Sequence, residues 1–105
     1  MGRFVLEQLG REGVVTDGVK VDPARLTALV LLGVRDEHTV PLIFYRETCA
    51  DMGLTEADID PAFIARARAL VVTGTHFSRP NVDAAGRKAI AAAKAAGRRV
   101  AFDID

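Results

Sequence analysis

An alanine-rich helical stretch enclosed by two apolar runs is the feature that most constrains the fold of this chain. Apolar residues at Ala69–Thr73 and again at 99–105 predict two buried strands. Between them, Asn81 offers an N-cap for a helix, and Gly97 offers the residue that ends it. Strand, crossover helix and strand together predict a βαβ unit over 69–105, in which the two strands are parallel.

The segment before this unit carries two further helix-start signals. Thr55 followed by Asp58 resembles a capping box with aspartate in place of glutamate. Asp60 precedes a proline at the first helical position, which predicts a short helix over 61–67. Residues 55–105 are therefore expected to form α/β structure.

The preceding part of the chain has a different pattern, which is typical of an antiparallel sheet. Runs rich in β-branched and apolar residues cover 14–21, 26–35 and 40–46. The first two runs are connected at Asp22 by residues that favour a turn. The proline after Asp22 fixes φ, and the aspartate side chain can hydrogen-bond to nearby backbone. These runs predict a small antiparallel meander of three strands over about 14–46.

Both ends of the chain break off within an expected element. Apolar residues near helical spacing predict a short amphipathic helix over 1–12, but no capping residue precedes it. At the other end, the last strand finishes on Asp105 with no turn or helix after it. We therefore expect the chain to be a segment of a larger α/β protein.

Charge and cysteine content disfavour several classes of partner and location. The 105 residues carry 14 basic and 14 acidic side chains, so the formal net charge is zero. Without an overall positive field, binding to nucleic acid or to an anionic membrane surface is not expected. The lone Cys49 cannot close an intramolecular disulfide, and no apolar run approaches membrane-spanning length. The expected location is therefore cytoplasmic.

The strongest candidate for ligand binding is the stretch that ends the antiparallel region. Strand alternation places Phe44 and Arg46 on the same face. An aromatic ring beside a guanidinium suits a sugar acid, because the ring packs against C–H groups while the arginine forks onto a carboxylate or hydroxyls. The alternative is an edge strand whose solvated arginine prevents aggregation.

Two further candidates follow the expected parallel strands, at the sheet edge where open α/β sheets bind ligands. His76 lies in the loop after the first strand. It is either a donor or proton carrier for a substrate, or an ordinary hydrogen-bonding residue. Asp103 and Asp105 sit two apart on the last strand and share a face. They either orient a metal, a hydroxyl or a loop, or cap a following element.

Other chemistry-bearing residues define no site. Cys49 has no histidine partner in the sequence, so we expect a small buried residue rather than a nucleophile. No ligand spacing supports a metal site that combines His38 or His76 with acidic residues. Phosphate-loop, dinucleotide-binding and nucleophile-elbow motifs are missing from the sequence. We therefore assign no catalytic residue, no cofactor-binding residue and no metal ligand.

Four segments, in this order, resemble the ribokinase-like PfkB family of carbohydrate kinases. They are Leu-Thr-Ala-Leu-Val-Leu at 26–31, Pro-Leu-Ile-Phe-Tyr-Arg-Glu-Thr-Cys-Ala-Asp-Met at 41–52, Thr-Gly-Thr-His-Phe-Ser at 73–78 and Phe-Asp-Ile-Asp at 102–105. Tyr-Arg and Ala-Asp in the second segment resemble fructokinases and 2-keto-3-deoxygluconate kinases alike, whereas Cys-Ala-Asp-Met and Thr-Gly-Thr-His-Phe-Ser are more particular to a sugar-acid kinase of the family. The resemblance covers essentially the whole chain.

This resemblance implies a division of the chain and an activity. Residues 1–12 are then a helix remnant, 14–50 a lid that closes over the sugar, and 55–105 part of the α/β core. The implied activity is phosphorylation of a hydroxyl of 5-dehydro-2-deoxy-D-gluconate, a compound of myo-inositol catabolism, with ATP and Mg²⁺. Fructose and 2-keto-3-deoxygluconate are the alternative substrates.

The resemblance also implies substrate-binding roles for residues of both parts. Phe44 and Arg46 face the sugar acid in such kinases, and Thr27 faces the same pocket from its lid strand. His76 lies in the loop beside the substrate. The remaining candidates, Asp103 and Asp105, match a strand-end element that precedes an arginine in the family.

Several parts of the family's machinery have no counterpart in this sequence. These are the amino-terminal strand with its Gly-Gly sugar-binding region, the Gly-x-Gly-Asp segment and the nucleotide site. A kinase must position a phosphate, a metal and an activated hydroxyl together. The chain alone is therefore expected to be inactive and to bind ATP and Mg²⁺ poorly.

A rival hypothesis is a stand-alone, non-catalytic α/β module that binds an anion or a partner. A kinase segment has unpaired sheet edges and exposed apolar surface, so it is expected to self-associate through the lid or those edges. A monodisperse monomer that unfolds cooperatively would favour the module instead.

Overall fold

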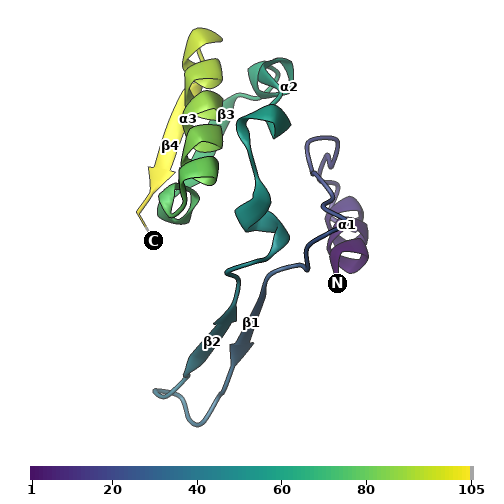
Figure 1. Ribbon diagram of the computed structural model, residues 1–105, viewed down its shortest axis with the longest axis vertical. Helices are drawn as coiled ribbons and strands as arrows, with labels where there is room; N and C mark the ends of the chain where they lie inside the picture. Colours follow the sequence, from purple (N-terminus) through teal and green to yellow (C-terminus); the bar gives the residue numbers. More distant parts are fainter. Residues whose placement is uncertain (105) are drawn as a thin grey trace. The chain divides into compact units, whose positions relative to one another are not determined.

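The computed structural model describes residues 1–104, which form two compact units. The first unit contains Met1–Thr16 and Val21–Gly53, and the second contains Asp17–Lys20 and the chain from Leu54 onward. Figure 1 shows the elements of both units coloured along the sequence.

The first unit begins with helix α1 (Gly2–Arg11), which confirms the helix expected from the amphipathic spacing. Gly13 follows the helix with a φ of 74°, a left-handed conformation that glycine adopts without steric cost. Its N–H donates to Gly10 O at 3.1 Å, and the Val14 N–H donates to Leu9 O at 2.9 Å. These bonds satisfy the last carbonyls of the helix, so the end of α1 is specified by local sequence.

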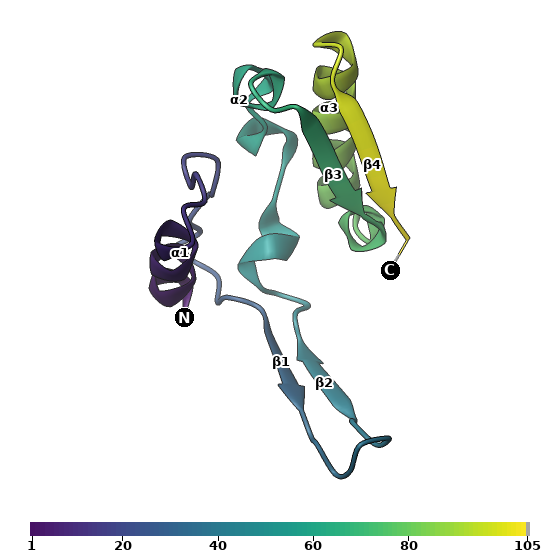
Figure 2. The same ribbon diagram turned by 180° about the vertical axis from the view of Figure 1, so that it is seen from behind.

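Strands β1 (Leu29–Leu32) and β2 (Leu42–Tyr45) form an antiparallel hairpin, which Figures 1 and 2 show as a narrow arm. Beyond the strands, the Gly33 N–H donates to Pro41 O at 2.9 Å. Proline is tolerated at this place because only its carbonyl takes part in the pairing. Every residue of the two strands is exposed within this unit.

The strand expected over 14–21 does not form, so the antiparallel sheet of residues 1–104 has two strands rather than three. Val14 completes the end of α1, and a turn at Asp17 and Gly18 interrupts the run. Gly18 lies against the ring of Phe63, where a Cβ would come within 2.7 Å of the Cε1 atom. The β-branched residues of this run favour a strand, but a strand also requires a partner to pair with.

The second unit contains the predicted βαβ arrangement. Strands β3 (Ala69–Thr73) and β4 (Arg99–Asp103) are parallel and paired along their whole length. Helix α3 (Pro80–Ala95) connects them and lies along one face of the sheet (Figure 2). The parallel pairing confirms the predicted arrangement, but the prediction of buried strands is wrong for β4, which is mostly exposed because α3 covers only one face of the sheet.

Small side chains of α3 form the core of the second unit. Alanine allows a helix backbone to approach a sheet closely, and the buried side chains follow the face of α3 that contacts the strands. The buried apolar residues of α3 and β3 are Val72, Val82, Ala85, Ala89 and Ala93. The alanine-rich composition therefore serves close packing on the sheet.

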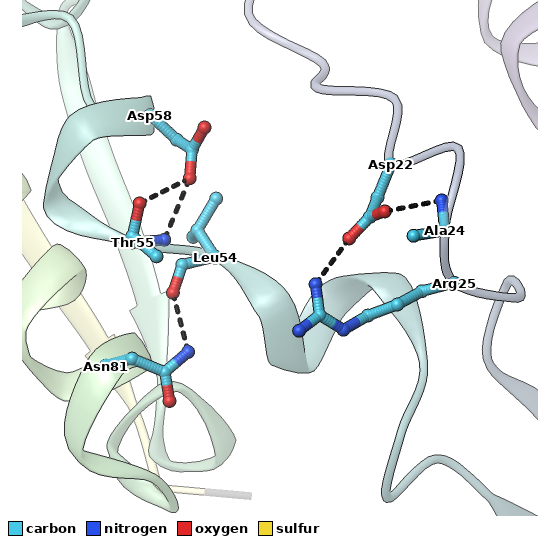
Figure 3. A network of polar contacts seen from close by, with 7 residues as sticks. All are labelled: Asp22, Ala24, Arg25, Leu54, Thr55, Asp58 and Asn81. Atoms are coloured by element: carbon cyan, nitrogen blue, oxygen red, sulfur yellow. Dashed lines mark hydrogen bonds and ion pairs between the residues drawn. The ribbon is translucent and has the colours of Figure 1, made fainter.

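The two ends of α3 differ in how well they were predicted. The helix begins at Pro80 with Arg79 as its N-cap, so the prediction of Asn81 as the cap is wrong. Proline fits the first helical position because its missing N–H has no partner there. Asn81 instead donates from Nδ2 to the carbonyl of Leu54 at 2.8 Å (Figure 3). At the far end, Gly97 adopts a φ of 67° and ends the helix as predicted.

Two short elements precede β3 in the second unit, η2 (Glu56–Asp58) and α2 (Pro61–Ala65). Thr55 donates from N–H and from Oγ1 to one oxygen of Asp58, at 2.9 and 2.8 Å (Figure 3). The Asp60 carboxylate accepts a backbone N–H at 2.9 Å. Both capping predictions are confirmed, although α2 ends two residues earlier than expected.

Exposed apolar surface lies on the strands. Val71 of β3 is 65% exposed, and its register partner Ala101 is exposed as well. These two residues mark the face of the parallel sheet opposite α3. Within residues 1–104, no helix has the length and apolar character needed to cross a membrane.

Candidate functional site

A depression of about 620 Å³ lies in the first unit, where β2 ends and the chain turns. It combines aromatic, cationic and small side chains from two stretches of sequence. The lining residues are Ala24, Arg25, Leu26, Phe44, Tyr45, Arg46, Glu47, Thr48 and Cys49. Two residues predicted from sequence to bind a sugar acid, Phe44 and Arg46, are therefore brought together here.

An ion pair with Asp51 holds Arg46. Strand β2 ends at Tyr45, so the alternation that placed Phe44 and Arg46 on one face stops before the arginine. Arg46 Nε donates to Asp51 Oδ2 at 2.5 Å, and both side chains are about one-third exposed, 37% and 34%. Asp51 belongs to the short helix η1 (Ala50–Gly53). The ion pair involves Nε of Arg46. Within residues 1–104, the two terminal nitrogens of this guanidinium have no hydrogen-bond or ion-pair partner.

Arg25 is a second cation on the same depression, and sequence reasoning did not single it out. Its Nη1 pairs with Asp22 Oδ2 at 2.6 Å, and the other carboxylate oxygen accepts the Ala24 N–H at 2.8 Å (Figure 3). The Arg25 hydrogen bond, followed by the Ala24 N–H, holds the pKa of the Asp22 carboxyl below its ordinary value. The sequence signal that could have identified Arg25 is its position in a turn, shortly after an aspartate and a proline.

Backbone contacts fix the two stretches that line the depression. The Ala50 N–H donates to Leu26 O at 2.8 Å, which ties the segment around Arg25 to the start of η1. Cys49 is 8% exposed, and its thiol lies 3.3 Å from the Tyr45 carbonyl. The expectation of a small buried cysteine is therefore confirmed.

This arrangement can bind a polyhydroxylated molecule that carries a carboxylate. Phe44 and Tyr45 are 62% and 54% exposed, so apolar ring surface is available. Arg46 and Arg25 each use one guanidinium nitrogen to bind an aspartate of the same unit. The other nitrogens of each guanidinium retain N–H donors for a ligand. Guanidinium forks match the planar geometry of carboxylates, and rings pack against the C–H faces of sugars.

Thr27 is not among the residues that line this depression. The residue comes just before β1, and its hydroxyl lies beside the start of α1. A Cβ built on Gly2 would approach Thr27 Oγ1 to 3.3 Å. The substrate contact implied for Thr27 therefore stays a prediction.

His76 belongs to the second unit, in the short helix η3 (Gly74–Phe77) after β3. Its Nδ1 accepts the Thr73 N–H at 3.1 Å and lies 3.2 Å from Thr73 Oγ1. Because Nδ1 accepts a hydrogen bond, the neutral ring carries its proton on Nε2. His76 thus caps the helix start and presents one N–H donor, which agrees with the alternative of a locally hydrogen-bonded residue and leaves the substrate role a prediction.

Asp103 is the last residue of β4 and pairs in register with Thr73. This pairing places Asp103 at the same edge of the parallel sheet as His76, as the sequence predicted. The other predicted aspartate, Asp105, lies outside the described residues. Within residues 1–104, no group of three or more metal-ligating side chains comes together.

Comparisons with curated proteins connect this arrangement to sugar kinases. No family model matches the chain. The 5-dehydro-2-deoxygluconokinase of Shouchella clausii is 30% identical over 105 residues, and that of Geobacillus kaustophilus is 31% identical over 106 residues. These alignments cover 99% and 100% of the chain but 32% of each relative. The chain therefore spans about one-third of the length of these relatives.

Solved structures give the same assignment of fold. The PfkB protein from Polaromonas sp. JS666 has a TM-score of 0.90 and 31% identity, over 100% of this chain and 36% of its own. A fructokinase from Xylella fastidiosa with bound ATP has a TM-score of 0.91 and 24% identity, over 100% and 32%.

The fold is thus that of the ribokinase-like sugar kinases, as the sequence resemblance implied. By sequence and structure, the chain is similar to carbohydrate kinases of the PfkB family and matches about one-third of the length of such a protein. Within that family, both curated relatives described above are 5-dehydro-2-deoxygluconokinases.

Proposed function

We propose that this chain supplies the lid and part of the α/β core of a kinase that phosphorylates 5-dehydro-2-deoxy-D-gluconate. In this division, residues 14–50 form the lid and residues from 55 onward form the core part. The observation that carries the proposal is the depression in which Arg46, held by Asp51, lies with Phe44. The names of the curated relatives support the same substrate.

The roles of the first-unit residues follow from their chemistry. Arg46 binds the carboxylate of the sugar acid through its terminal nitrogens, because Nε is already used by Asp51. Phe44 packs against the C–H face of the carbon chain. Thr27 contributes a hydroxyl from the segment before β1. Together these contacts orient the substrate.

The roles of the second-unit residues concern the substrate hydroxyls. His76 donates from Nε2–H to a hydroxyl or carbonyl oxygen, since its Nδ1 is used by Thr73. Asp103, at the end of β4, accepts a hydrogen bond from a hydroxyl, and Asp105 is assigned the same role. These groups hold the substrate, and none of them is assigned a catalytic step.

ATP and Mg²⁺ are implied by the kinase family, but the residues of this chain do not fit a site for them. Residues 1–104 bring together no metal-ligating cluster, and the sequence has no phosphate-binding glycine motif. No step is therefore assigned to a nucleotide or a metal on this chain. We propose that the 105-residue chain alone does not transfer a phosphoryl group.

A kinase assay on two proteins tests this proposal. The first is the chain alone, for which no ATP-dependent phosphorylation of the sugar acid is expected. The second is the Geobacillus kaustophilus relative with its matching third replaced by this chain. We expect this hybrid to phosphorylate 5-dehydro-2-deoxy-D-gluconate in preference to 2-keto-3-deoxygluconate and fructose.

The substitution Arg46→Ala in the hybrid tests the assigned contact. Loss of a charged hydrogen bond should raise KM for the sugar acid about tenfold or more and should affect fructose little. The matched control is Arg35→Ala, in the hairpin connection of the same unit and outside the depression. An active hybrid with an unchanged KM after Arg46→Ala would contradict the role of Arg46.

A further inference from the structure

We infer that Arg25 is a second specificity-determining residue of the depression and selects acids over neutral polyols. The inference rests on the proposed function, because it assumes that a sugar acid occupies this site. It concerns a residue that neither the sequence pattern nor the family resemblance singled out. The supporting observations are the placement of Arg25, its tether to Asp22 and its contact with Gly53.

Arg25 and Arg46 come from distant parts of the first unit and line one depression. The hydrogen bond from the Ala50 N–H to Leu26 O, 2.8 Å long, joins the residue after Arg25 to the helix that holds Arg46. A backbone bond of this kind fixes where both arginines are attached. Their joint presence at the depression is therefore a property of the fold.

Each guanidinium is tethered at a different edge, which leaves different donors for a ligand. Arg46 is paired through Nε and keeps both terminal nitrogens. Arg25 is paired through Nη1 to Asp22 at 2.6 Å and keeps Nε and Nη2. The Arg25 side chain is 46% exposed, so a ligand in water can reach these donors. Both residues line the depression and both keep N–H donors, so we assign both guanidiniums to the carboxylate of the ligand.

The short helix η1 acts on both arginines. It carries Asp51, the partner of Arg46, and it ends at Gly53 against the Arg25 guanidinium. A Cβ at Gly53 would lie 2.6 Å from Arg25 Nη1 and 3.0 Å from Cζ. Arg25 must therefore move if this glycine gains a side chain. Gly53 is a positioning residue, which acts on a ligand only through Arg25.

Glu47 adds a negative charge to the depression. Its side chain is exposed and lines the same depression, so it repels an anion there. Asp22 and Asp51 further offset the charge of their arginines. Because these three carboxylates offset the two arginines, our inference assigns a donor from both guanidiniums to an acid. A neutral polyol is not repelled and depends less on the second cation.

The test is an NMR titration of the 105-residue chain with gluconate and, separately, with the neutral polyol sorbitol. Wild type, Arg25→Gln, Gly53→Ala and Arg46→Gln are compared, with Arg35→Gln as the matched control outside the depression. Backbone amide spectra establish that each variant keeps its fold. The side-chain N–H signals of the arginines report which guanidinium meets the ligand.

The expected result is a loss of gluconate affinity of about tenfold or more in Arg25→Gln and in Gly53→Ala, as for one charged hydrogen bond. Sorbitol affinity should change less than about twofold, and Arg35→Gln should match wild type. Unchanged gluconate binding in Arg25→Gln, with a loss in Arg46→Gln, would overturn the inference and leave the proposed function standing. Equal losses for both ligands would overturn the selectivity. A wild-type chain that gluconate does not saturate would overturn both.

Discussion

Arg46 donates from Nε to Oδ2 of Asp51 at 2.5 Å, so the guanidinium is held from its side. Asp51→Ala removes this tether and leaves Arg46 free to sample other rotamers. We expect sugar-acid affinity to fall about threefold to tenfold, because the arginine must be ordered again on binding. Stability should fall by about 1 kcal/mol or less, since the pair is about one-third exposed. Calorimetric titration and thermal unfolding measure the two effects.

Asp36→Ala is the control for this change. Asp36 lies in the hairpin connection of the same unit, outside the depression, where its carboxylate accepts the His38 N–H at 2.9 Å. The substitution Asp36→Ala removes one negative charge, as Asp51→Ala does, but it leaves the ion pair of Arg46 intact. Equal affinity losses in the two variants would show that net charge, rather than the tether, governs binding.

The hydrogen bond from Thr73 N–H to His76 Nδ1 predicts a single neutral tautomer, with the proton on Nε2. Nitrogen chemical shifts of the ring at alkaline pH measure this directly. His76→Ala should destabilise the second unit by about 1 kcal/mol, the usual cost of a lost cap. His76→Asp should recover most of this, because Asp58 fills the equivalent position of the Thr55 cap. A ring protonated on Nδ1 would contradict the capping geometry.

Asp22 should titrate below the ordinary aspartate value of 3.8, chiefly because of its hydrogen bond from Arg25. A lowered pKa in the folded state means that the stabilising effect is complete above the ordinary pKa. It is lost as the pH falls through the folded pKa. Carboxyl carbon NMR follows the titration of this residue. In Arg25→Gln, the pKa of Asp22 should rise toward 3.8.

Asp36 is the internal reference in the same titration. Its pKa is also lowered, but first by the His38 backbone N–H, and Arg25 is not among the causes. It should therefore be unaffected by Arg25→Gln. A parallel rise in both aspartates would indicate a change of the whole unit rather than loss of one ion pair.

Two glycines should respond in opposite directions to alanine. Gly10 lies within α1, and a Cβ there would meet no atom within 4 Å, so Gly10→Ala should stabilise by about 0.5–1 kcal/mol. Gly97 has a φ of 67°, so Gly97→Ala should destabilise by about 1 kcal/mol. Thermal unfolding compares the two variants. Stabilisation by Gly97→Ala would be inconsistent with the left-handed end of α3.

Local sequence signals predicted much of the second unit. The apolar run at Ala69–Thr73, the cap at Asp60 and the stop at Gly97 each act over a few residues, and each is found in the structure. The start of α3 was misplaced by two residues, because the sequence offers both Asn81 as an N-cap and Pro80 as a first helical residue. Asn81 instead bonds to a carbonyl distant in sequence.

Outside the βαβ unit, three features that depend on contacts between separate segments were not predicted. The strand expected over 14–21 lacks a partner in the described chain, although its β-branched residues favour one. Arg25 became a site residue only through the bond between Ala50 and Leu26. Arg46 lines the depression, but its alignment comes from Asp51 rather than from strand alternation.

The most direct test of the central claim is an NMR titration of the 105-residue chain with 5-dehydro-2-deoxy-D-gluconate. We predict saturable amide shifts at residues 24–26 and 44–49, which line the depression. The affinity should be reduced in Arg46→Ala and unchanged in Arg35→Ala. No saturable shift in these two segments, or an equal response in Arg46→Ala, would contradict the assignment of a sugar-acid site to this part of the chain.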